Sequence, residues 1–281
     1  MKHVVLSNED FQDFPIGEFP YDKDHTAMGE YQYVVANGYH GNWVDMVCNY
    51  TYNGTGPTWL ITERDGRHFM ESMRIEKNRP HRMFPTLETG KHQWKDYEVS
   101  VSVRCLSQKG MAGLVFSMNH SIDTLVFYLD GKDKAAVAYR HKEEVQILKE
   151  VSFPHGCDQE YRLKVDCDGR IAKVYVDDQE LFRVENDLVA RGGKVGITAD
   201  CPSRFADFKV CVSEKTKQEI DVAELAVKEA ETEEMKKHPK MKLWKKIDLK
   251  NFGTSRQIRF GHLTGTDEWY VVLAQMQKRI C

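Results

Sequence analysis

The sequence lacks any apolar run that approaches the roughly 18 residues needed to span a bilayer. Residues 1–11 also lack the hydrophobic stretch of a signal peptide. An excess of one charge sign is missing as well, because 43 acidic residues nearly balance 40 basic ones and leave a net charge of −3. These absences argue against a membrane protein and against nucleic acid as a partner, and we expect the chain to stay in the cytoplasm.

The seven cysteines are scattered, and no Cys-x-x-Cys pair occurs among them. Zinc sites usually need such closely spaced thiols, so we expect isolated reduced cysteines and no metal. A phosphate-cradling glycine loop and a Ser/His/Asp nucleophile set are also missing. The chain of 281 residues, 41% of them hydrophobic, is nonetheless large enough to bury a full core.

What the sequence does contain, between residues 94 and 212, is a hydrophobic pattern of period two. Apolar side chains take every second position from Tyr97 to Val103, which is typical of a strand with one buried face. Similar strands are predicted at residues 114–117, 125–129, 136–140, 145–148, 161–166, 171–176, 181–184, 195–199 and 205–212. Turn residues separate them at Asp130-Gly131, Asp168-Gly169, Asp177-Asp178 and Gly192-Gly193. With no helix pattern among these strands, they predict an all-β fold, an antiparallel jelly-roll β-sandwich.

The first 93 residues carry shorter strand candidates separated by long loops. These lie at residues 2–6, 31–36, 45–50, 58–62 and 69–75. Tyrosine and tryptophan crowd residues 31–59, a span too rich in loops to hide every ring in a core. We therefore expect some of these rings to face a ligand.

The composition changes after residue 213. Glutamate, lysine and alanine dominate up to residue 238, and opposite charges at i,i+4 spacing predict a helix that Pro239 ends. Strand patterns return at residues 243–249 and 257–275, with too few strands to close another core. The predicted organisation is a sandwich over residues 1–213, a helical charged linker over 214–240, and an incomplete second β domain, a short C-terminal β segment, over 241–281.

Two segments have the composition of a saccharide site. The loop of residues 37–43 places Tyr39, His40 and Trp43 between glycines and amides, and sugar rings stack on aromatic faces while their hydroxyls bond to polar groups. The alternative is an ordinary loop in which Trp43 plugs the core.

Arg64, Arg67 and His68 begin a basic segment, whose guanidinium groups would suit the carboxylates of a uronic-acid polymer. The alternative there is a solvated strand edge.

Four segments resemble the concanavalin-A-like, laminin-G-type jelly roll. They are residues 96–99 (Asp-Tyr-Glu-Val), 161–165 (Tyr-Arg-Leu-Lys-Val), 193–197 (Gly-Lys-Val-Gly-Ile) and 205–210 (Phe-Ala-Asp-Phe-Lys-Val). The resemblance covers most of residues 1–213. It implies that the first and last strands lie side by side, and that the domain binds carbohydrate or protein.

The tail is similar to the opening blade of the β-propeller in rhamnogalacturonan-lyase-like polysaccharide lyases. The similar residues are 243–247 (Leu-Trp-Lys-Lys-Ile), 259–263 (Arg-Phe-Gly-His-Leu) and 272–275 (Val-Leu-Ala-Gln). This resemblance implies a lyase whose propeller mostly lies beyond Cys281, as a missing C-terminal partner that holds the catalytic residues, so that this chain alone is inactive. Blades of that family can hold calcium, but residues 261–268 carry carboxylates only at their end, and we expect no cofactor.

Residues 219–224 (Glu-Ile-Asp-Val-Ala-Glu) match the catalytic signature of laminarinase-like jelly-roll β-glucanases. Those enzymes use two carboxylates as nucleophile and general acid. Here the hexapeptide runs into the helical pattern, where Glu219 and Glu224 would point away from each other, so we expect a solvated linker helix. A glycoside hydrolase would require these residues to form an inner strand facing a cleft.

The function that these observations favour is recognition of an oligo- or polysaccharide that contains uronate and rhamnose, as part of a polysaccharide-lyase-like protein. The alternative is a laminin-G-type protein-interaction module, which a large exposed apolar patch without a groove would favour.

Overall fold

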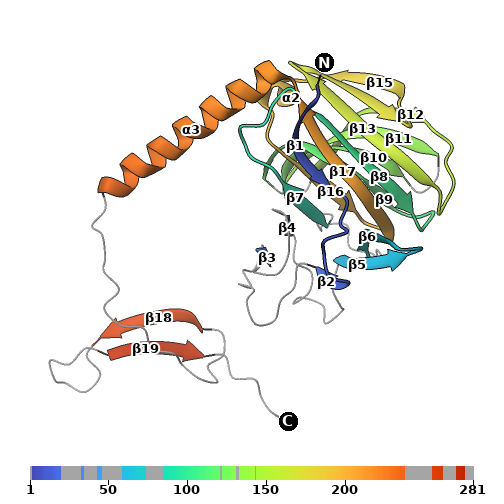
Figure 1. The fold of residues 1–281 in the computed structure, drawn as a ribbon. Coiled ribbons are helices and arrows are strands. Elements are labelled where there is room, and N and C mark those ends of the chain that lie inside the picture. The colour runs from blue at the N-terminus through green and yellow to red at the C-terminus, as the bar shows by residue number, and fades with distance from the viewer. Residues whose placement is uncertain are drawn as a thin grey trace, which may run out of the picture. The chain divides into compact units, whose positions relative to one another are not determined.

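The structure is a computed structural model that describes residues 2–19, 33–34, 43–45, 59–73, 85–120, 122–130, 133–142, 144–237, 255–261 and 270–275. The chain divides into two compact units, Met1–Ala230 and Glu231–Cys281. The first unit holds a β-sandwich, and the second holds a two-stranded hairpin (Figure 1). Within the described part of the chain, no helix has both the length and the apolar character that a membrane span needs.

The strands of the first unit follow one another with short connections over most of its length. They are β1 (Val4–Glu9), β2 (Gly17–Phe19), β3 (Tyr33–Val34), β4 (Val44–Asp45), β5 (Trp59–Arg64), β6 (Arg67–Ser72), β7 (Thr86–Thr89), β8 (Glu98–Cys105), β9 (Met111–His120), β10 (Asp123–Asp130), β11 (Lys134–His141), β12 (Glu144–Ser152), β13 (Glu160–Asp168), β14 (Ile171–Val176), β15 (Gln179–Glu185), β16 (Lys194–Ala199) and β17 (Ser203–Val212). Every strand predicted between residues 94 and 212 is confirmed.

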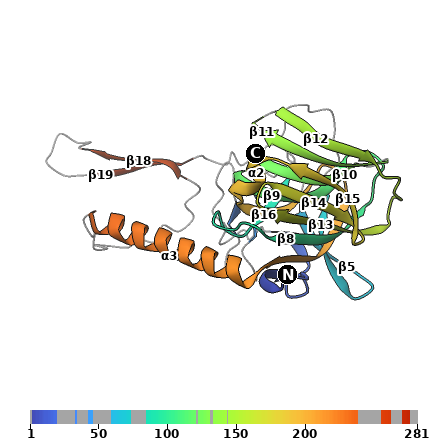
Figure 2. The ribbon, with the colours of Figure 1, turned by 90° about the horizontal axis from the view of Figure 1, so that it is seen from above.

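Two antiparallel sheets form the sandwich, which confirms the predicted jelly-roll fold. The nine-stranded sheet has the order β15-β14-β13-β8-β17-β6-β5-β2, with β1 paired to β17, and the eight-stranded sheet has the order β12-β11-β10-β9-β16-β7-β4-β3. Figure 2 shows β10, β11 and β12 on one side of the sandwich and β8 and β13 on the other.

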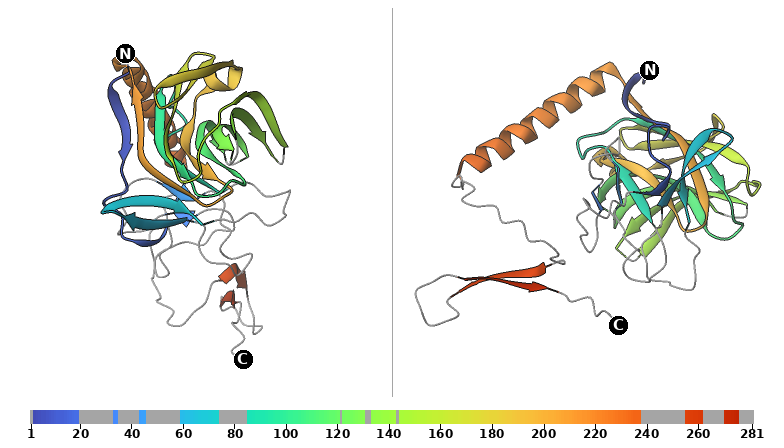
Figure 3. Two further views of the ribbon diagram at one scale, coloured as in Figure 1. Left: turned by 90° about the vertical axis from the view of Figure 1, so that its right-hand side faces the viewer. Right: turned by 60° about the horizontal axis from the view of Figure 1, so that its bottom comes forward.

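The first and last strands of the sandwich lie side by side, as the resemblance implied. β1 pairs with β17 from Val4 opposite Val212 to Glu9 opposite Phe208, with an irregularity between Val5 and Ser7 (Figure 3). This pairing matters for the site, because the chain leaves β17 directly into helix α3 (Glu214–Lys237). The start of α3 is thereby brought next to β1.

The core lies between the two sheets and explains the period-two pattern. Val99, Val101 and Val103 of β8 are fully buried in it, while the serines between them lie on the other face of the sheet. The turn predicted at Asp177-Asp178 is confirmed, since both residues have the positive φ of a tight hairpin turn.

The prediction of a helix-free strand region is wrong at one place. Helix α2 (Asp187–Arg191) lies between β15 and β16, and the Asn186 side chain caps it by accepting a hydrogen bond from the Leu188 N–H at 2.9 Å. Five residues are less than two turns, so they cannot display a helical period in the sequence. The longer helix predicted for residues 213–238 is confirmed as α3.

The second unit contains an antiparallel hairpin. β18 (Ser255–Gly261) pairs with β19 (Tyr270–Gln275), and Gly261 lies opposite Tyr270. The predicted return to strand over residues 257–275 is confirmed for these segments, whereas residues 243–249 lie outside the described part of the chain. Residues 262–268, which were considered as a calcium-binding loop, also lie outside the described part of the chain.

Candidate functional site

The aromatic loop predicted to meet a ligand is described only at its end. Tyr39 and His40 lie outside the described residues, and Trp43 is only 2% exposed. The Trp43 ring packs edge-on against Phe208, with centroids 4.8 Å apart, and lies 5.7 Å from the Phe11 ring. Trp43 is therefore buried in the core, which is the alternative considered for this loop. Trp43 also lines part of a cavity.

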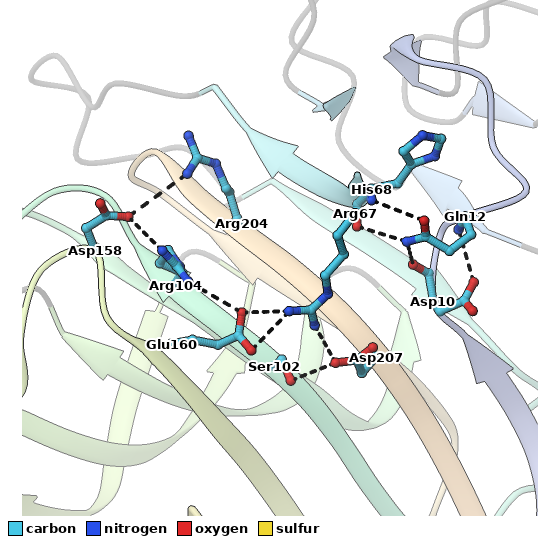
Figure 4. A network of polar contacts seen from close by, with 10 residues as sticks. All are labelled: Asp10, Gln12, Arg67, His68, Ser102, Arg104, Asp158, Glu160, Arg204 and Asp207. Atoms are coloured by element: carbon cyan, nitrogen blue, oxygen red, sulfur yellow. Dashed lines mark hydrogen bonds and ion pairs between the residues drawn. The ribbon is translucent and has the colours of Figure 1, made fainter. Parts of the chain in front are cut away.

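The predicted basic residues lie on the hairpin of β5 and β6, where they contact the protein itself. Arg67 donates from Nη1 to both carboxylate oxygens of Glu160, at 3.1 and 3.2 Å, and from Nη2 to Asp207 (Figure 4). Arg64 is exposed at the hairpin turn and donates to the Glu63 carbonyl at 3.0 Å. The guanidinium fork expected to hold a uronate is thus occupied by carboxylates of the same chain.

His68 has a structural contact as well. Its backbone N–H donates to the Gln12 side chain at 3.4 Å, and its Nδ1 lies 3.3 Å from the Phe11 carbonyl oxygen. The ring's Nε2 is 3.9 Å from Glu63. His68 therefore fastens the hairpin of β5 and β6 to the segment that follows β1.

The contacts of Arg67 belong to a wider row of alternating charges on the outer face of the nine-stranded sheet. Arg104 contacts Asp158 at 3.5 Å and Glu160 at 3.8 Å, and Arg204 contacts Glu71 at 2.9 Å. Figure 4 shows Arg67, Arg104 and Arg204 reaching across neighbouring strands toward Asp158, Glu160 and Asp207. Because carboxylates alternate with the arginines, this face is not a cationic surface for an acidic polymer.

Arg67 should therefore matter for stability. The change Arg67→Ala leaves Glu160 and Asp207 without their shared cation, and we expect a loss of about 1 kcal/mol, small because the pairs are partly solvated. Arg64→Ala is the matched control, with a smaller expected effect. Urea unfolding of both variants measures this, and equal losses would contradict the assigned role of the ion pairs.

A cavity of about 650 Å³ lies elsewhere, between β1, the segment after β7, and the first turns of α3. Its lining combines two tryptophans with amide, hydroxyl and charged groups. The lining residues are Val5, Leu6, Ser7, Asn8, Glu9, Trp43, Thr89, Gly90, Lys91, Trp94, Lys217, Ile220, Asp221 and Glu224. Its volume falls in the range of small-molecule sites.

Helix α3 forms one wall of the cavity because its first turns pack on the sandwich. Ile220 is 1% exposed and belongs to the core, and the Ser213 hydroxyl caps the helix by accepting from the Thr216 N–H at 3.1 Å. The expectation of a merely solvated linker is therefore wrong for these turns. Because charged side chains dominate the sequence of α3, the burial of its one isoleucine was not predicted from the sequence.

The two glutamates of the hexapeptide 219–224 both contact the segment after β7. Glu219 contacts Lys95 at 2.9 Å, and Glu224 forms an ion pair with Lys91. On helix α3 the two positions lie about 140° apart, as the helical pattern predicted, and their long side chains reach two different lysines of this segment. Of the two glutamates only Glu224 lines the cavity, and both lie on helix α3, so they do not form the inner strand that a glycoside hydrolase would need.

Trp94 is fixed by glycines on two sides. Gly90 has φ +87°, and a Cβ there would lie 2.5 Å from the Trp94 ring, so only glycine leaves room for the indole. Gly193 donates its N–H to the Trp94 carbonyl at 2.8 Å. The ring, 7% exposed, is consequently a rigid part of the cavity wall.

Glu9 lies at the end of β1 beside the Trp43 indole. Its carboxylate accepts hydrogen bonds from the Phe11 N–H, at 2.8 Å, and from the Trp43 side chain. Burial raises the pKa of Glu9 above its usual 4.5, and these two hydrogen bonds oppose the shift. The cavity thus holds a carboxylate whose protonation is easier than that of an exposed one.

This raised pKa gives a test. The folded protein holds the Glu9 proton more tightly than the unfolded chain, so the contribution to stability is present below pH 4.5 and is lost as pH rises through the folded pKa. Glu9→Gln should flatten the decline of the unfolding free energy over this window. Urea unfolding between roughly pH 4 and 7 measures it, with Glu144→Gln, at an exposed carboxylate, as control. An unchanged slope in Glu9→Gln would contradict the assignment.

A second, smaller hollow in the sandwich is too small for a sugar. It measures about 80 Å³ and lies on the outer face of the eight-stranded sheet, between Met111, Val126, Tyr128, Ala138, Arg140 and Val145. Burial lowers the pKa of Arg140 to about 10, and its Nη1 donates to Thr86 at 3.4 Å. In the part of the chain that the structure describes, no group of three His, Cys, Asp or Glu side chains could hold a metal ion.

Fold and cavity together define a jelly-roll β-sandwich with a helix-walled, tryptophan-lined cavity. No family model and no curated protein matches the chain. Among solved structures it is similar to a carbohydrate-binding module, CBM66, from Bacillus subtilis, at 15% identity and a TM-score of 0.45, over 55% of this chain and 91% of that one.

Two further solved structures are similar to parts of the chain. The galectin LEC-6 from Caenorhabditis elegans is 11% identical, with a TM-score of 0.38, over 50% of this chain and 94% of the galectin. The GH43 protein BlXynB from Bacillus licheniformis is 14% identical, with a TM-score of 0.44, and the chain covers only 40% of its length. Likenesses this distant carry none of the argument about the cavity.

Proposed function

We propose that the sandwich binds a neutral sugar unit of a glycan in the cavity between β1, Trp94 and α3. The observation that carries the proposal is the lining itself, in which Trp43 and Trp94 stand beside amide, hydroxyl and charged groups in a space of about 650 Å³. Sugars offer apolar C–H faces to aromatic rings and hydroxyls to polar groups, so this mixture suits them. The similar structures include a carbohydrate-binding module and a galectin, but the proposal does not rest on them.

The charges of the cavity favour a neutral sugar over a uronate. Three carboxylates, those of Glu9, Asp221 and Glu224, face two lysines, Lys91 and Lys217, so the lining has one net negative charge. Both lysines already contact carboxylates, Lys217 at 2.5 Å from Asp221 and Lys91 at Glu224. An additional carboxylate would meet repulsion and lose its hydration.

The assignment to a polysaccharide-lyase-like protein adds a finer proposal, supported by the resemblance of residues 243–275 alone. In a glycan that alternates uronate with rhamnose, rhamnose is the neutral unit and would occupy the cavity. Its methyl group would suit the apolar indole surfaces. The alternative of a protein-interaction module is less well supported, because the criterion for it was an apolar patch without a groove, and a cavity is present.

Isothermal titration with a set of oligosaccharides tests this function. Neutral gluco-, galacto-, xylo- and rhamno-oligosaccharides are compared with a glucuronate oligomer on the full chain. We expect heat of binding from at least one neutral series and none from the uronate oligomer. Binding of the uronate oligomer alone, or no heat of binding from any neutral series, would overturn the proposal.

A further inference from the structure

Two buried cysteines meet where the chain passes from the eight-stranded sheet to the nine-stranded sheet. Cys105 ends β8, and Cys201 lies in the short bend between β16 and β17. Ser203 of β17 stands opposite Cys105, and the Leu106 N–H donates to the Pro202 carbonyl at 2.9 Å. The strand register therefore places two thiols, far apart in the sequence, beside each other.

The side chain of Cys201 folds back toward this pair of strands. Its Sγ lies 3.4 Å from the Ser203 hydroxyl and 3.6 Å from the Met111 carbonyl oxygen. Cys105 and Cys201 are 4% and 2% exposed, and both are free thiols. Because Ser203 is the register partner of Cys105 and the Cys201 sulfur lies against the Ser203 hydroxyl, both thiols lie on the same side of this junction, which is the arrangement that a bond between them requires.

The two thiols are not equivalent. The Cys105 thiol donates a hydrogen bond to the Cys201 sulfur, which lowers the pKa of Cys201 and raises that of Cys105. Thiolates, not thiols, are the nucleophiles of cysteine chemistry. Cys201 is consequently the sulfur of the pair that an oxidant meets as a nucleophile, and Cys105 is the resolving partner.

We propose that Cys105 and Cys201 form a peroxide-oxidisable dithiol that closes to a disulfide. The Cys201 thiolate attacks one oxygen of hydrogen peroxide, the O–O bond breaks, and the departing hydroxide takes up a proton to leave as water. The Cys105 sulfur then attacks the resulting Cys201 sulfenic acid, the S–O bond breaks, and a second water leaves with the Cys105 proton. Two thiols and one peroxide thus give one disulfide and two waters.

The bond would join β8 to the connection between the two sheets. It would close a loop of about 100 residues, which is the kind of cross-link that restricts the unfolded chain most. We expect the oxidised protein to unfold at a temperature on the order of 10 °C higher than the reduced protein. The crossover from β16 to β17 would then resist opening.

Other described cysteines are controls for this assignment. Cys167 is fully buried without such a sulfur neighbour among the described residues, and burial raises its pKa. Cys157 is exposed, and it precedes Asp158, whose N–H donates to the Cys105 carbonyl at 2.7 Å. Cys157 is therefore the competing partner for Cys105.

Peptide mapping of the full chain after treatment with hydrogen peroxide tests the proposal. Under non-reducing conditions we expect a cross-linked peptide that joins Cys105 to Cys201, the loss of two titratable thiols, and a raised unfolding temperature. Cys201→Ser should abolish all three, and Cys167→Ser should abolish none. A Cys105–Cys157 cross-link, or sulfinic acid at Cys201 without a cross-link, would overturn the proposal. The mapping of the unchanged chain is decisive even if a variant fails to fold.

Discussion

Replacing Trp94 by alanine is expected to abolish saccharide binding. The ring packs against Gly90 and lines the cavity together with residues of α3, and in the proposed function it supplies apolar surface to the sugar. Removing a buried aromatic anchor typically costs at least about 2 kcal/mol of binding, or roughly 30-fold in affinity. Isothermal titration with the best ligand of the oligosaccharide set measures this loss.

Two controls separate binding from folding in this experiment. Trp94→Phe keeps a ring in the wall and should retain most of the affinity. Trp59→Phe changes a fully buried ring that does not line the cavity, and it should cost stability without a specific loss of binding. Full affinity in a folded Trp94→Ala protein would place the sugar elsewhere.

Replacing Ile220 by aspartate is expected to have the second-largest effect, because it detaches the helical wall of the cavity. Ile220 is the buried hydrophobic side chain among the described residues of α3, and a carboxylate cannot be buried there without a partner. We expect binding to weaken by about tenfold or more and the amide protons of residues 214–224 to exchange faster. Hydrogen exchange and titration of the same sample measure both.

Leu225→Asp is the matched control for this prediction. Leu225 lies on the same helix but is 55% exposed, so its replacement should change neither exchange nor affinity. Equal effects of Ile220→Asp and Leu225→Asp would show that general damage to α3, and not loss of the packed wall, governs binding.

The strands could be predicted because a sheet with one buried face has apolar residues at every second position of its strands. Val99, Val101 and Val103 face the core, and β13 and β14 show the same alternation of buried and more exposed residues. Helix α2 was missed because five residues show no period. β2 and β7 were missed as well, since strands of three and four residues are too short for alternation to stand out.

The cavity could be predicted only in part. Glu9, Lys91, Trp94 and Asp221 come from three distant segments that share no motif. The predicted adjacency of the first and last strands does, however, place β1 beside the start of the helix that follows β17. That inference indicates where the site lies, although it does not identify Trp94 as part of it.

The basic residues show a different limit of sequence reasoning. Arg67 was expected to hold an acidic ligand because a guanidinium fits a carboxylate, and in the structure it contacts two carboxylates of its own chain. Its carboxylates, Glu160 and Asp207, are remote in sequence and reach it only through the pairing of β6, β17, β8 and β13. Charge partners of this kind follow from topology and not from local composition.

The most direct test of the central claim is a nuclear magnetic resonance titration that follows the tryptophan indole N–H signals. We predict that a neutral oligosaccharide shifts the signals of Trp43 and Trp94, which line the cavity, and leaves that of the fully buried Trp59 unchanged. Saturating binding that leaves the Trp43 and Trp94 signals in place would contradict the account.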